Sequence, residues 1–251
     1  MAQGIKLRRA MVLAAGLGLR MRPLTLERPK PLLSVAGTTM LDHALDRLAK
    51  AGVERALVNA HYKAEMVVEA VRGRLRPTVE VSVEPALLET GGGVRRSLPW
   101  LGPEPFAVAN ADILWFDGAE SALAGMARQW DGERMDALLL MMPVERAFGY
   151  DGDGDFTLAD GGPGGGLDGE GKGCGRLARR RPDTTAPYVF AGVQITCPEA
   201  FHDTPEGPFS NNLVWNRAEA AGRLWGMVHD GAWYHIGTPQ ALTEARRRLG
   251  E

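Results

Sequence analysis

The chain has 251 residues, of which 45% are hydrophobic, enough for one large domain or two small ones with a packed core. Its 29 Lys and Arg residues nearly balance 31 Asp and Glu residues, and the net charge of −2 excludes a protein whose overall charge attracts nucleic acid or an anionic membrane surface. No apolar run approaches the ~20 residues of a membrane span, and the two cysteines, Cys174 and Cys197, fit no disulfide or metal-ligand spacing, as expected of a cytoplasmic protein with free thiols.

Apolar segments of strand length alternate with helical patterns through the first half of the chain. Strands are predicted at 10–15, 53–59, 79–83, 106–110 and 137–144, and helices at 39–51, 63–75 and near 118–130. Continuous apolar strands separated by amphipathic helices are typical of a sheet that is covered on both faces. The pattern predicts an α/β fold of the Rossmann-like, doubly wound type with a mainly parallel mixed sheet.

The regular alternation stops at Gly149. Twelve glycines lie between Gly149 and Gly175, so 149–175 is expected to form a hairpin with a mobile surface insertion rather than part of the core. Its "DGDGD" is not an EF-hand loop, because Phe156 and Gly162 stand where that loop requires glycine and glutamate. The later predicted elements are a strand at 186–196, a helix within 211–222, a strand near 224–230, and a last helix that begins at Pro239 with Thr238 as its N-cap.

The stretch "LAAGLGLRMRPLTLERPKPLL", residues 13–33, has the composition of an anion-binding loop. It is not a dinucleotide fingerprint, because Met21 stands where the third glycine is needed, and it lacks the Gly-Lys-Ser/Thr of a P-loop. Its glycines let backbone N–H groups approach a ligand at the end of the first strand. Its prolines stiffen the path between three cations, Arg20, Arg22 and Lys30. We expect a phosphate group there; the alternative is that these are solvated loop charges.

Five motifs, in the same order along the chain, resemble those of the sugar-1-phosphate nucleotidylyltransferases. They are the loop above with its "RPKPLL", then "LLETGGGV", "VANADI", "YVFAGVQI" and "WYHIGTPQAL". The resemblance implies one nucleotide-diphospho-sugar transferase domain over 1–251, with a nucleotide-binding half at 8–145 and a sugar-binding half at 146–251. The "ETGGG" form and the lack of a β-helix repeat look most like the members that act in peptidoglycan recycling on UTP and N-acetylmuramic acid α-1-phosphate.

This resemblance implies a reaction in which a sugar 1-phosphate attacks the α-phosphorus of a nucleoside triphosphate and releases pyrophosphate. Arg20 is expected to hold the β- and γ-phosphates, and Lys30 the α-phosphate and the incoming sugar phosphate. Asp112 is expected to bind Mg2+. The family pattern W-x-D-x-G-T implies a second acidic metal ligand where this chain has His235. Either the ion relies on Asp112 and phosphates, or Mn2+ is used, or catalysis has decayed, or His235 is merely hydrogen-bonded at a strand end.

The resemblance also assigns residues to the nucleotide and the sugar. Glu84 could accept a hydrogen bond from a base N–H, but uracil and guanine both offer one, so it does not discriminate between them. The sugar-binding candidates are Asn110, Gly192 and Arg181, and the last belongs to an "ARRR" run that solvation alone explains. The nucleotide-binding candidates are Leu13, Ala14, Ala15, Gly16, Gly18, Glu84, Glu89, Thr90, Gly91 and Gly92.

The sequence leaves two other functions open. One is a guanylyl- or uridylyltransferase for another hexose or heptose 1-phosphate, and the second is a catalytically weak regulatory protein that binds a nucleotide sugar, motivated by His235. In each case the expected partners are small phosphorylated molecules, with neither nucleic acid nor membrane, and the chain is expected to be a monomer or a small homo-oligomer.

Overall fold

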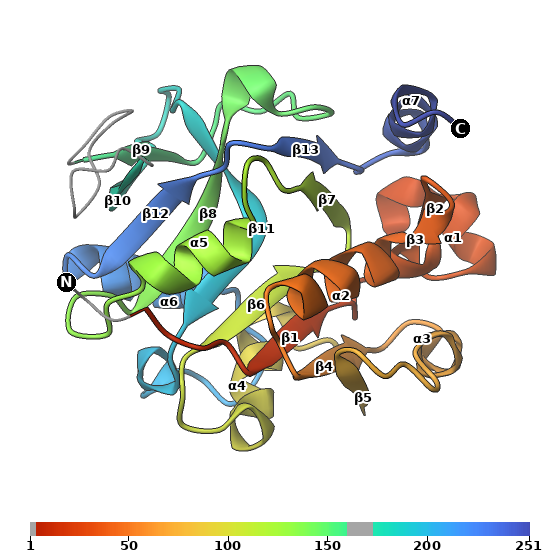
Figure 1. Ribbon diagram of the computed structural model, residues 1–251, viewed down its shortest axis with the longest axis horizontal. Helices are drawn as coiled ribbons and strands as arrows, with labels where there is room; N and C mark the ends of the chain where they lie inside the picture. Colours follow the sequence, from red (N-terminus) through yellow and green to blue (C-terminus); the bar gives the residue numbers. More distant parts are fainter. Residues whose placement is uncertain (1–3, 160–172) are drawn as a thin grey trace.

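The computed structural model describes residues 4–159 and 173–251. Their centre is a nine-stranded sheet that runs through both halves of the chain (Figure 1). In spatial order its strands are β5 (Thr78–Val83), β4 (Arg55–Ala60), β1 (Arg9–Leu13), β6 (Phe106–Asn110), β11 (Tyr188–Thr196), β8 (Ala137–Pro143), β12 (Leu224–Val228), β10 (Cys174–Arg179) and β9 (Phe156–Leu158).

Strands from the first half of the chain form the parallel part of this sheet. β5, β4, β1 and β6 are mutually parallel, and β12 runs parallel to β8. β11 is antiparallel to both β6 and β8, and β10 is antiparallel to β12 and β9. The predicted α/β fold with a mixed, mainly parallel sheet is confirmed. Because parallel strands end at the same edge, the segments that follow β1, β4 and β6 meet there.

Helices cover both faces of the sheet (Figure 1). On β1, Val12 packs with α2 (Met40–Lys50), α3 (Ala64–Ala70) and α5 (Ala122–Gln129) in one cluster. The next residue back, Met11, packs on the opposite face with α4 (Glu89–Leu101) and α6 (Asn212–Ala220). Successive residues of a strand point to opposite faces of the sheet, and both faces are buried here. The sequence of β1 is therefore continuously hydrophobic.

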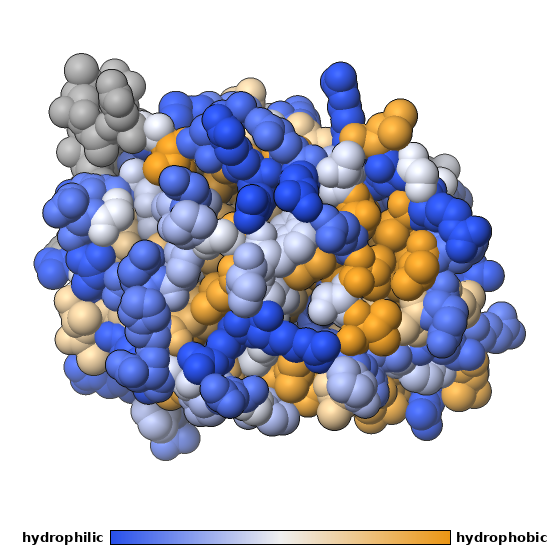
Figure 2. Space-filling view, turned by 90° about the horizontal axis from the view of Figure 1, so that it is seen from below, coloured by the Kyte–Doolittle hydropathy of each residue, from blue (hydrophilic) through white to orange (hydrophobic). Residues whose placement is uncertain are grey.

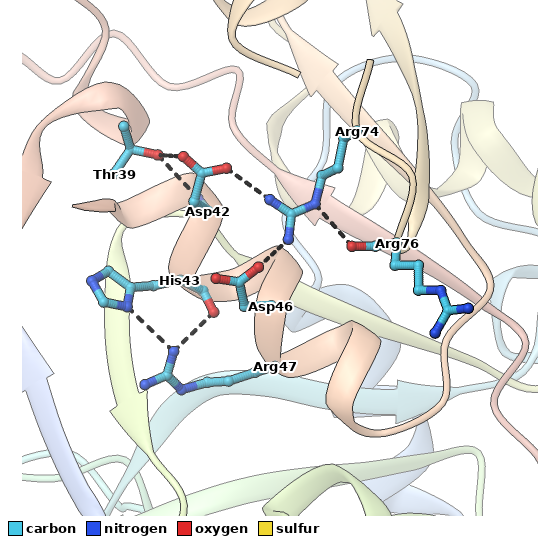
Figure 3. A network of polar contacts seen from close by, with 7 residues as sticks. All are labelled: Thr39, Asp42, His43, Asp46, Arg47, Arg74 and Arg76. Atoms are coloured by element: carbon cyan, nitrogen blue, oxygen red, sulfur yellow. Dashed lines mark hydrogen bonds and ion pairs between the residues drawn. The ribbon is translucent and has the colours of Figure 1, made fainter. Parts of the chain in front are cut away.

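A polar network ties α2 to the segment that follows α3 (Figure 3). The Thr39 hydroxyl accepts a hydrogen bond from the Asp42 backbone at 3.0 Å and so caps α2. The Asp42 carboxylate accepts one from Arg74 at 2.8 Å, and Arg74 also pairs with Asp46 and donates to the Arg76 carbonyl oxygen at 3.2 Å. Charge-assisted bonds therefore join α2 to the segment that follows α3.

The end of the chain returns to the loop at 13–33. β13 (Ala232–His235) pairs antiparallel with β7 (Ile113–Phe116), and α7 (Pro239–Arg248) follows, capped as predicted by Thr238, whose hydroxyl accepts from Ala241. A separate apolar cluster joins Met21 of the loop to Ile236 and Leu242. The loop itself holds α1 (Leu24–Glu27), η1 (Leu19–Met21) and η2 (Lys30–Leu32), and β2 (Ser34–Val35) pairs with β3 (Thr38–Thr39) behind it.

The structure differs from the sequence predictions in two places. No element was predicted at 89–101, where the structure has helix α4; its three glycines and Pro99 are poor helix formers, and tertiary packing supports them here. The segment 149–175 was expected to stay out of the core, yet Phe156 is 1% exposed and packs edge-on against Trp215. The predicted hairpin pairing exists as β9 and β10, while 160–172 of the predicted insertion lies outside the described residues.

The loop 13–33 exposes apolar side chains. Among the described residues, large exposed hydrophobic side chains include Leu17, Leu19, Leu24 and Leu26. Figure 2 shows a face on which hydrophobic residues gather at one end while hydrophilic residues cover most of the rest.

Over residues 4–159 and 173–251, none of the helices combines the length and the apolarity of a membrane-spanning segment.

Candidate active site

A cleft of about 550 Å³ opens at the carboxyl ends of β1, β4 and β6. The sheet register builds its floor, because Leu13 lies beside Asn59 on one side and beside Asn110 on the other. All three residues line the cleft. This is the edge where open α/β sheets bind ligands.

The loop 13–33 is shaped so that its cations reach this cleft. Gly18 adopts a positive φ of 61°, and a side chain there would lie 2.9 Å from Thr25 and 3.3 Å from Lys30. The Thr25 hydroxyl donates to the Gly18 carbonyl oxygen at 2.9 Å, which closes the loop on itself. Buried Met21 anchors the loop in the core. Arg20 and Lys30 consequently both line the cleft.

Lys30 and Asp112 form an ion pair inside the cleft. Lys30 Nζ lies 2.8 Å from Asp112 Oδ2, with the two side chains 8% and 41% exposed. Burial alone would raise the pKa of the Asp112 carboxyl, but the charge and hydrogen bond of Lys30 outweigh burial and hold the pKa below its usual value. Asp112 is therefore an ionised carboxylate at neutral pH, with one oxygen already bound to a cation.

His235 lies at the border of the cleft. Burial lowers the pKa of its imidazole, the charge of Lys30 lowers this pKa further, and Asp112 only partly opposes the two effects. A Cβ on Gly237, which lines the cleft, would lie 2.7 Å from His235 Nε2 and 3.6 Å from Arg20 Nη1. A neutral imidazole thus faces the same space as Arg20 and the Lys30–Asp112 pair.

These residues fit a cation that is shared with a ligand. One ionised carboxylate and one neutral imidazole offer an oxygen and a nitrogen donor, and a hard ion such as Mg2+ prefers about six oxygens. Within the described parts of the chain, no three His, Cys, Asp or Glu side chains gather in a group that could hold a metal ion. Phosphate oxygens would have to supply the remaining ligands, and the cations Arg20 and Lys30 are placed to attract them.

Glu84, which the resemblance assigns to the base, is buried beside the cleft. Glu84 is 2% exposed and is not among the residues that line the cleft. Its carboxylate accepts a hydrogen bond from Asn59 Nδ2 at 2.7 Å, and Asn59 Oδ1 in turn accepts one from the Ala14 backbone at 2.8 Å. Glu84 therefore lies beneath the cleft, where Asn59 joins it to Ala14 and its other carboxylate oxygen accepts from the Leu88 backbone at 3.4 Å.

Gly91 and Gly92 have a packing role that the motif did not reveal. A Cβ on Gly91 would collide with the ring of Phe209 and lie 2.9 Å from its carbonyl oxygen, and one on Gly92 would lie 2.6 Å from the Gly207 oxygen. Both backbone N–H groups donate to that Phe209 oxygen, at 2.8 and 3.0 Å. These glycines let the segment 207–209 dock on the start of α4, whereas Glu89 and Thr90 line the cleft.

Two of the three predicted sugar-binding residues lie outside the lining of the cleft. Gly192, in β11 with φ 79°, abuts Asn110, because a Cβ there would lie 3.4 Å from the Asn110 Cβ. Arg181 is exposed in a turn where its carbonyl oxygen accepts from Thr184. Asn110 lines the cleft. The structure thus brings Gly192 next to Asn110, whereas Arg181 is not among the residues that line the cleft.

Most of the predicted site residues share the cleft. The predicted residues that do not line it are Glu84, Gly91, Gly92, Gly192, Arg181 and His235. The predicted residues that line it are Leu13, Ala14, Ala15, Gly16, Gly18, Arg20, Lys30, Glu89, Thr90, Asn110 and Asp112.

Sequence reasoning missed several residues of the cleft, including Leu19, Leu87, Gly237 and above all Asn59. One signal could have identified Asn59. It is a polar residue at the end of the predicted strand 53–59, and the carboxyl ends of neighbouring parallel strands meet where ligands bind. Gly237 stands two residues after His235 in the last motif, where only the folded chain shows that it faces the cleft.

Comparisons with known proteins give the relatives of this chain. The family model described as nucleotidyl transferase matches residues 9–151. The chain is 44% identical to the N-acetylmuramate alpha-1-phosphate uridylyltransferase of Caulobacter vibrioides, over 96% of this chain and 97% of the relative. It is 34% identical to the enzyme with the same name from Neisseria meningitidis serogroup B, over 96% of this chain and 98% of the relative.

The fold has solved counterparts. A UDP-glucose pyrophosphorylase complexed with UDP-glucose matches with a TM-score of 0.78 over 96% of this chain and 98% of that chain, at 16% identity. At this identity the likeness establishes the fold alone, which is the nucleotide-diphospho-sugar transferase fold that the motifs implied.

Proposed function

The chain belongs to the nucleotidyl transferase family and is a sugar-1-phosphate nucleotidylyltransferase, and we propose that its substrates are UTP and N-acetylmuramic acid α-1-phosphate. The products are then UDP-N-acetylmuramic acid and pyrophosphate. The observation that carries this choice is the near full-length identity of 44% to a relative named for that substrate and for uridylyl transfer. The family expected from the five motifs is confirmed; the two substrates are our proposal.

In the proposed reaction, a phosphate oxygen of the sugar 1-phosphate attacks the α-phosphorus of UTP. The bond from that phosphorus to the oxygen bridging to the β-phosphate breaks, and pyrophosphate leaves with the electron pair. Two polyanions must approach each other, so positioning and charge neutralisation provide most of the catalysis. Lys30 is assigned to the α-phosphate and the sugar phosphate, and Arg20 to the β- and γ-phosphates and the leaving pyrophosphate. Their shared place in the cleft supports these roles.

We propose that a divalent cation, Mg2+ or else Mn2+, accompanies the phosphates. Asp112 would hold it, with His235 as the neighbouring nitrogen donor. Bound there, the ion would offset negative charge on the phosphate oxygens. Lys30, whose Nζ lies 2.8 Å from Asp112 Oδ2, would then transfer its contact from Asp112 to the phosphates. Neutral His235 adds no positive charge of its own and no negative charge to repel the substrates.

The remaining assignments are proposals of the same kind. The backbone from Leu13 to Gly16, with Gly18, Glu89 and Thr90, is proposed to bind the base and ribose, and Asn110 the sugar. Gly192 is proposed to keep Asn110 in place by its lack of a side chain. A single domain with a nucleotide-binding half at 8–145 and a sugar-binding half at 146–251, working in the cytoplasm as a monomer or small homo-oligomer, completes the proposal.

A substrate panel tests the function. Pyrophosphate release is measured for UTP, GTP, CTP, ATP and dTTP against N-acetylmuramic acid, N-acetylglucosamine, glucose, mannose and heptose 1-phosphates, with Mg2+ or Mn2+. We expect the highest kcat/KM for UTP with N-acetylmuramic acid α-1-phosphate. Preference for another pair would support a guanylyl- or uridylyltransferase for another sugar. Absence of turnover with every pair, combined with binding of a nucleotide sugar, would identify a regulatory binding protein instead.

A further inference from the structure

A buried chain of hydrogen bonds links Glu84 to the first strand through Asn59. From it we infer that Asn59 is a positioning residue, which sets the orientation of the backbone at Ala14 that receives the nucleotide. The inference rests on the proposed function of the cleft. Asn59 and Glu84 come from β4 and from the residue after β5, and Ala14 follows β1, so three neighbouring strands contribute one member each.

These hydrogen bonds fix the orientation of the Asn59 side-chain amide. The Asn59 amide nitrogen donates to Glu84 Oε1 at 2.7 Å, so this nitrogen points toward Glu84. The amide oxygen must then face the opposite way, where Ala14 N donates to it at 2.8 Å. If the amide turned over, two acceptors would face each other at Glu84 and two donors at Ala14. Glu84 thus selects the side of Asn59 that meets the loop.

The Asn59–Glu84 pair is almost fully buried. Asn59 and Glu84 are each 2% exposed, and Glu84 Oε2 also accepts a hydrogen bond from the Leu88 backbone N–H at 3.4 Å. Gly93 lies against both, because a Cβ there would lie 3.0 Å from Asn59 Nδ2 and 3.1 Å from Glu84 Oε1. A buried carboxylate whose hydrogen bond is lost carries a large desolvation penalty, so this geometry is held firmly.

The same contacts decide which backbone groups remain for a nucleotide. The Ala14 N–H is bound to Asn59, and the Leu13 carbonyl oxygen accepts from Ala111 at 3.0 Å. Ala15 and Gly16, which follow, line the cleft. The orientation of their backbone depends on Ala14, which these two hydrogen bonds hold in place. Uracil presents a polar edge of two carbonyl oxygens and one N–H, so even a small rotation at Ala14 weakens several hydrogen bonds together.

A double-mutant cycle tests this role. Asn59→Asp keeps the oxygen that accepts from Ala14 but places two carboxylates together. When Asn59→Asp is combined with Glu84→Gln, the amide of residue 84 can donate to the carboxylate of residue 59. The hydrogen bonds are then restored, with donor and acceptor exchanged between residues 59 and 84. We expect Asn59→Asp to raise KM for UTP about tenfold in the wild-type background and less than about threefold in the Glu84→Gln background, with kcat changed little. Asn216→Asp, an exposed asparagine on α6 that accepts from Arg179, is the matched control.

A pH profile separates positioning from a general loss of stability. Two carboxylates in contact share a proton as pH falls, which restores a donor between them. The affinity of Asn59→Asp for UTP, measured by calorimetry without the sugar phosphate, should therefore recover from pH 8 to pH 6. The double variant should lack this recovery. His61, whose Nδ1 lies 2.8 Å from the Glu84 carbonyl oxygen, is the other titratable group there and is kept in every variant.

The outcomes are distinct. Equal losses of UTP affinity from Asn59→Asp in the wild-type and Glu84→Gln backgrounds, with no recovery at low pH, would overturn the inference. So would a change of base preference caused by Glu84→Gln alone, since it would mean that Glu84 contacts the base. If the wild-type protein binds UTP but transfers its uridylyl group to none of the sugar phosphates, the proposed function fails while the affinity measurements still test Asn59.

Discussion

Lys30 Nζ lies 2.8 Å from Asp112 Oδ2, although 82 residues separate the two in the chain. One residue starts η2 in the loop after β1, and the other follows β6, the neighbouring parallel strand. The pair therefore assembles only when these strands are side by side. The pair places a cation and an anion in contact in the cleft. A phosphate can bind the Lys30 ammonium group, and a metal ion can bind the Asp112 carboxylate.

Removal of the Lys30 charge should disable catalysis. Lys30→Met leaves the phosphates without this cation and leaves Asp112 without its partner, so kcat/KM should fall by about 10²–10³, as when one transition-state donor is lost. Lys50→Met is the matched control, since Lys50 also pairs with an aspartate, Asp117, at 2.9 Å, but its side chain is 64% exposed. Its kcat/KM should stay within about twofold of the wild type. Comparable losses in both variants would remove the catalytic assignment of Lys30.

The metal requirement should respond to residue 235. His235→Asp adds a charged oxygen donor beside Asp112, so the Mg2+ concentration for half-maximal activity should fall several-fold. His202→Asp adds the same charge at an exposed position and should leave that concentration unchanged. Pyrophosphate release across a Mg2+ titration is the measurement. An unchanged or raised requirement in His235→Asp would refute a ligand position for residue 235.

The glycines at the start of α4 should be needed for stability. Gly91→Ala would press its methyl group into Phe209, and the strain should lower the free energy of unfolding by about 1–3 kcal/mol. Gly207→Ala makes the same substitution in the segment that docks on α4, with no atom within 4 Å of the added Cβ. It should be near neutral. Urea unfolding of both variants measures the difference, and equal stabilities would show that Gly91 does not need to be small.

A substitution at Gly93 should weaken nucleotide binding rather than the docking of the segment 207–209 on α4. The Cβ of Gly93→Ala would push against Asn59 and Glu84 instead of Phe209. We expect KM for UTP to rise several-fold while KM for the sugar phosphate stays close to the wild-type value. Steady-state kinetics with each substrate varied in turn provide the comparison. An equal rise in both KM values would indicate a general distortion of the cleft.

Stability should decline in mild acid because of buried histidines. His229 is 1% exposed, and burial lowers the pKa of its imidazole; the pKa of His235 is lowered for the same reason. The unfolded chain, with a histidine pKa of about 6.5, then binds protons more readily than the folded chain. The free energy of unfolding is therefore at its highest above about pH 6.5 and falls as pH decreases below that value.

Urea unfolding between pH 5 and pH 7.5 checks this dependence. His229→Asn should show a smaller loss of stability over that range than the wild type, because it removes one of the groups that must stay neutral. His202→Asn, at an exposed histidine, should keep the wild-type dependence. Identical slopes in His229→Asn and the wild type would exclude His229 as a source of acid sensitivity.

The elements that were predicted well are those whose signal is local. β6, at Phe106–Asn110, was predicted with its observed bounds, because an unbroken apolar run between polar ends is what a strand buried on both faces requires. The start of α7 was predicted because Thr238 caps it through a bond to Ala241, three residues away. Helix α4 was missed because its support comes from Phe209, more than a hundred residues later.

The amino-acid sequence by itself determined the α/β fold, the family, and a basic loop with Asp112 nearby, because periodicity and motif spacing are properties of neighbouring residues. Only the tertiary structure decided that Glu84 lies beneath the cleft, that Asn59 joins it to Ala14, and that Arg181 stays outside. These contacts depend on strand order and register, which bring residues 14, 59 and 84 together through hydrogen bonds that no local pattern encodes.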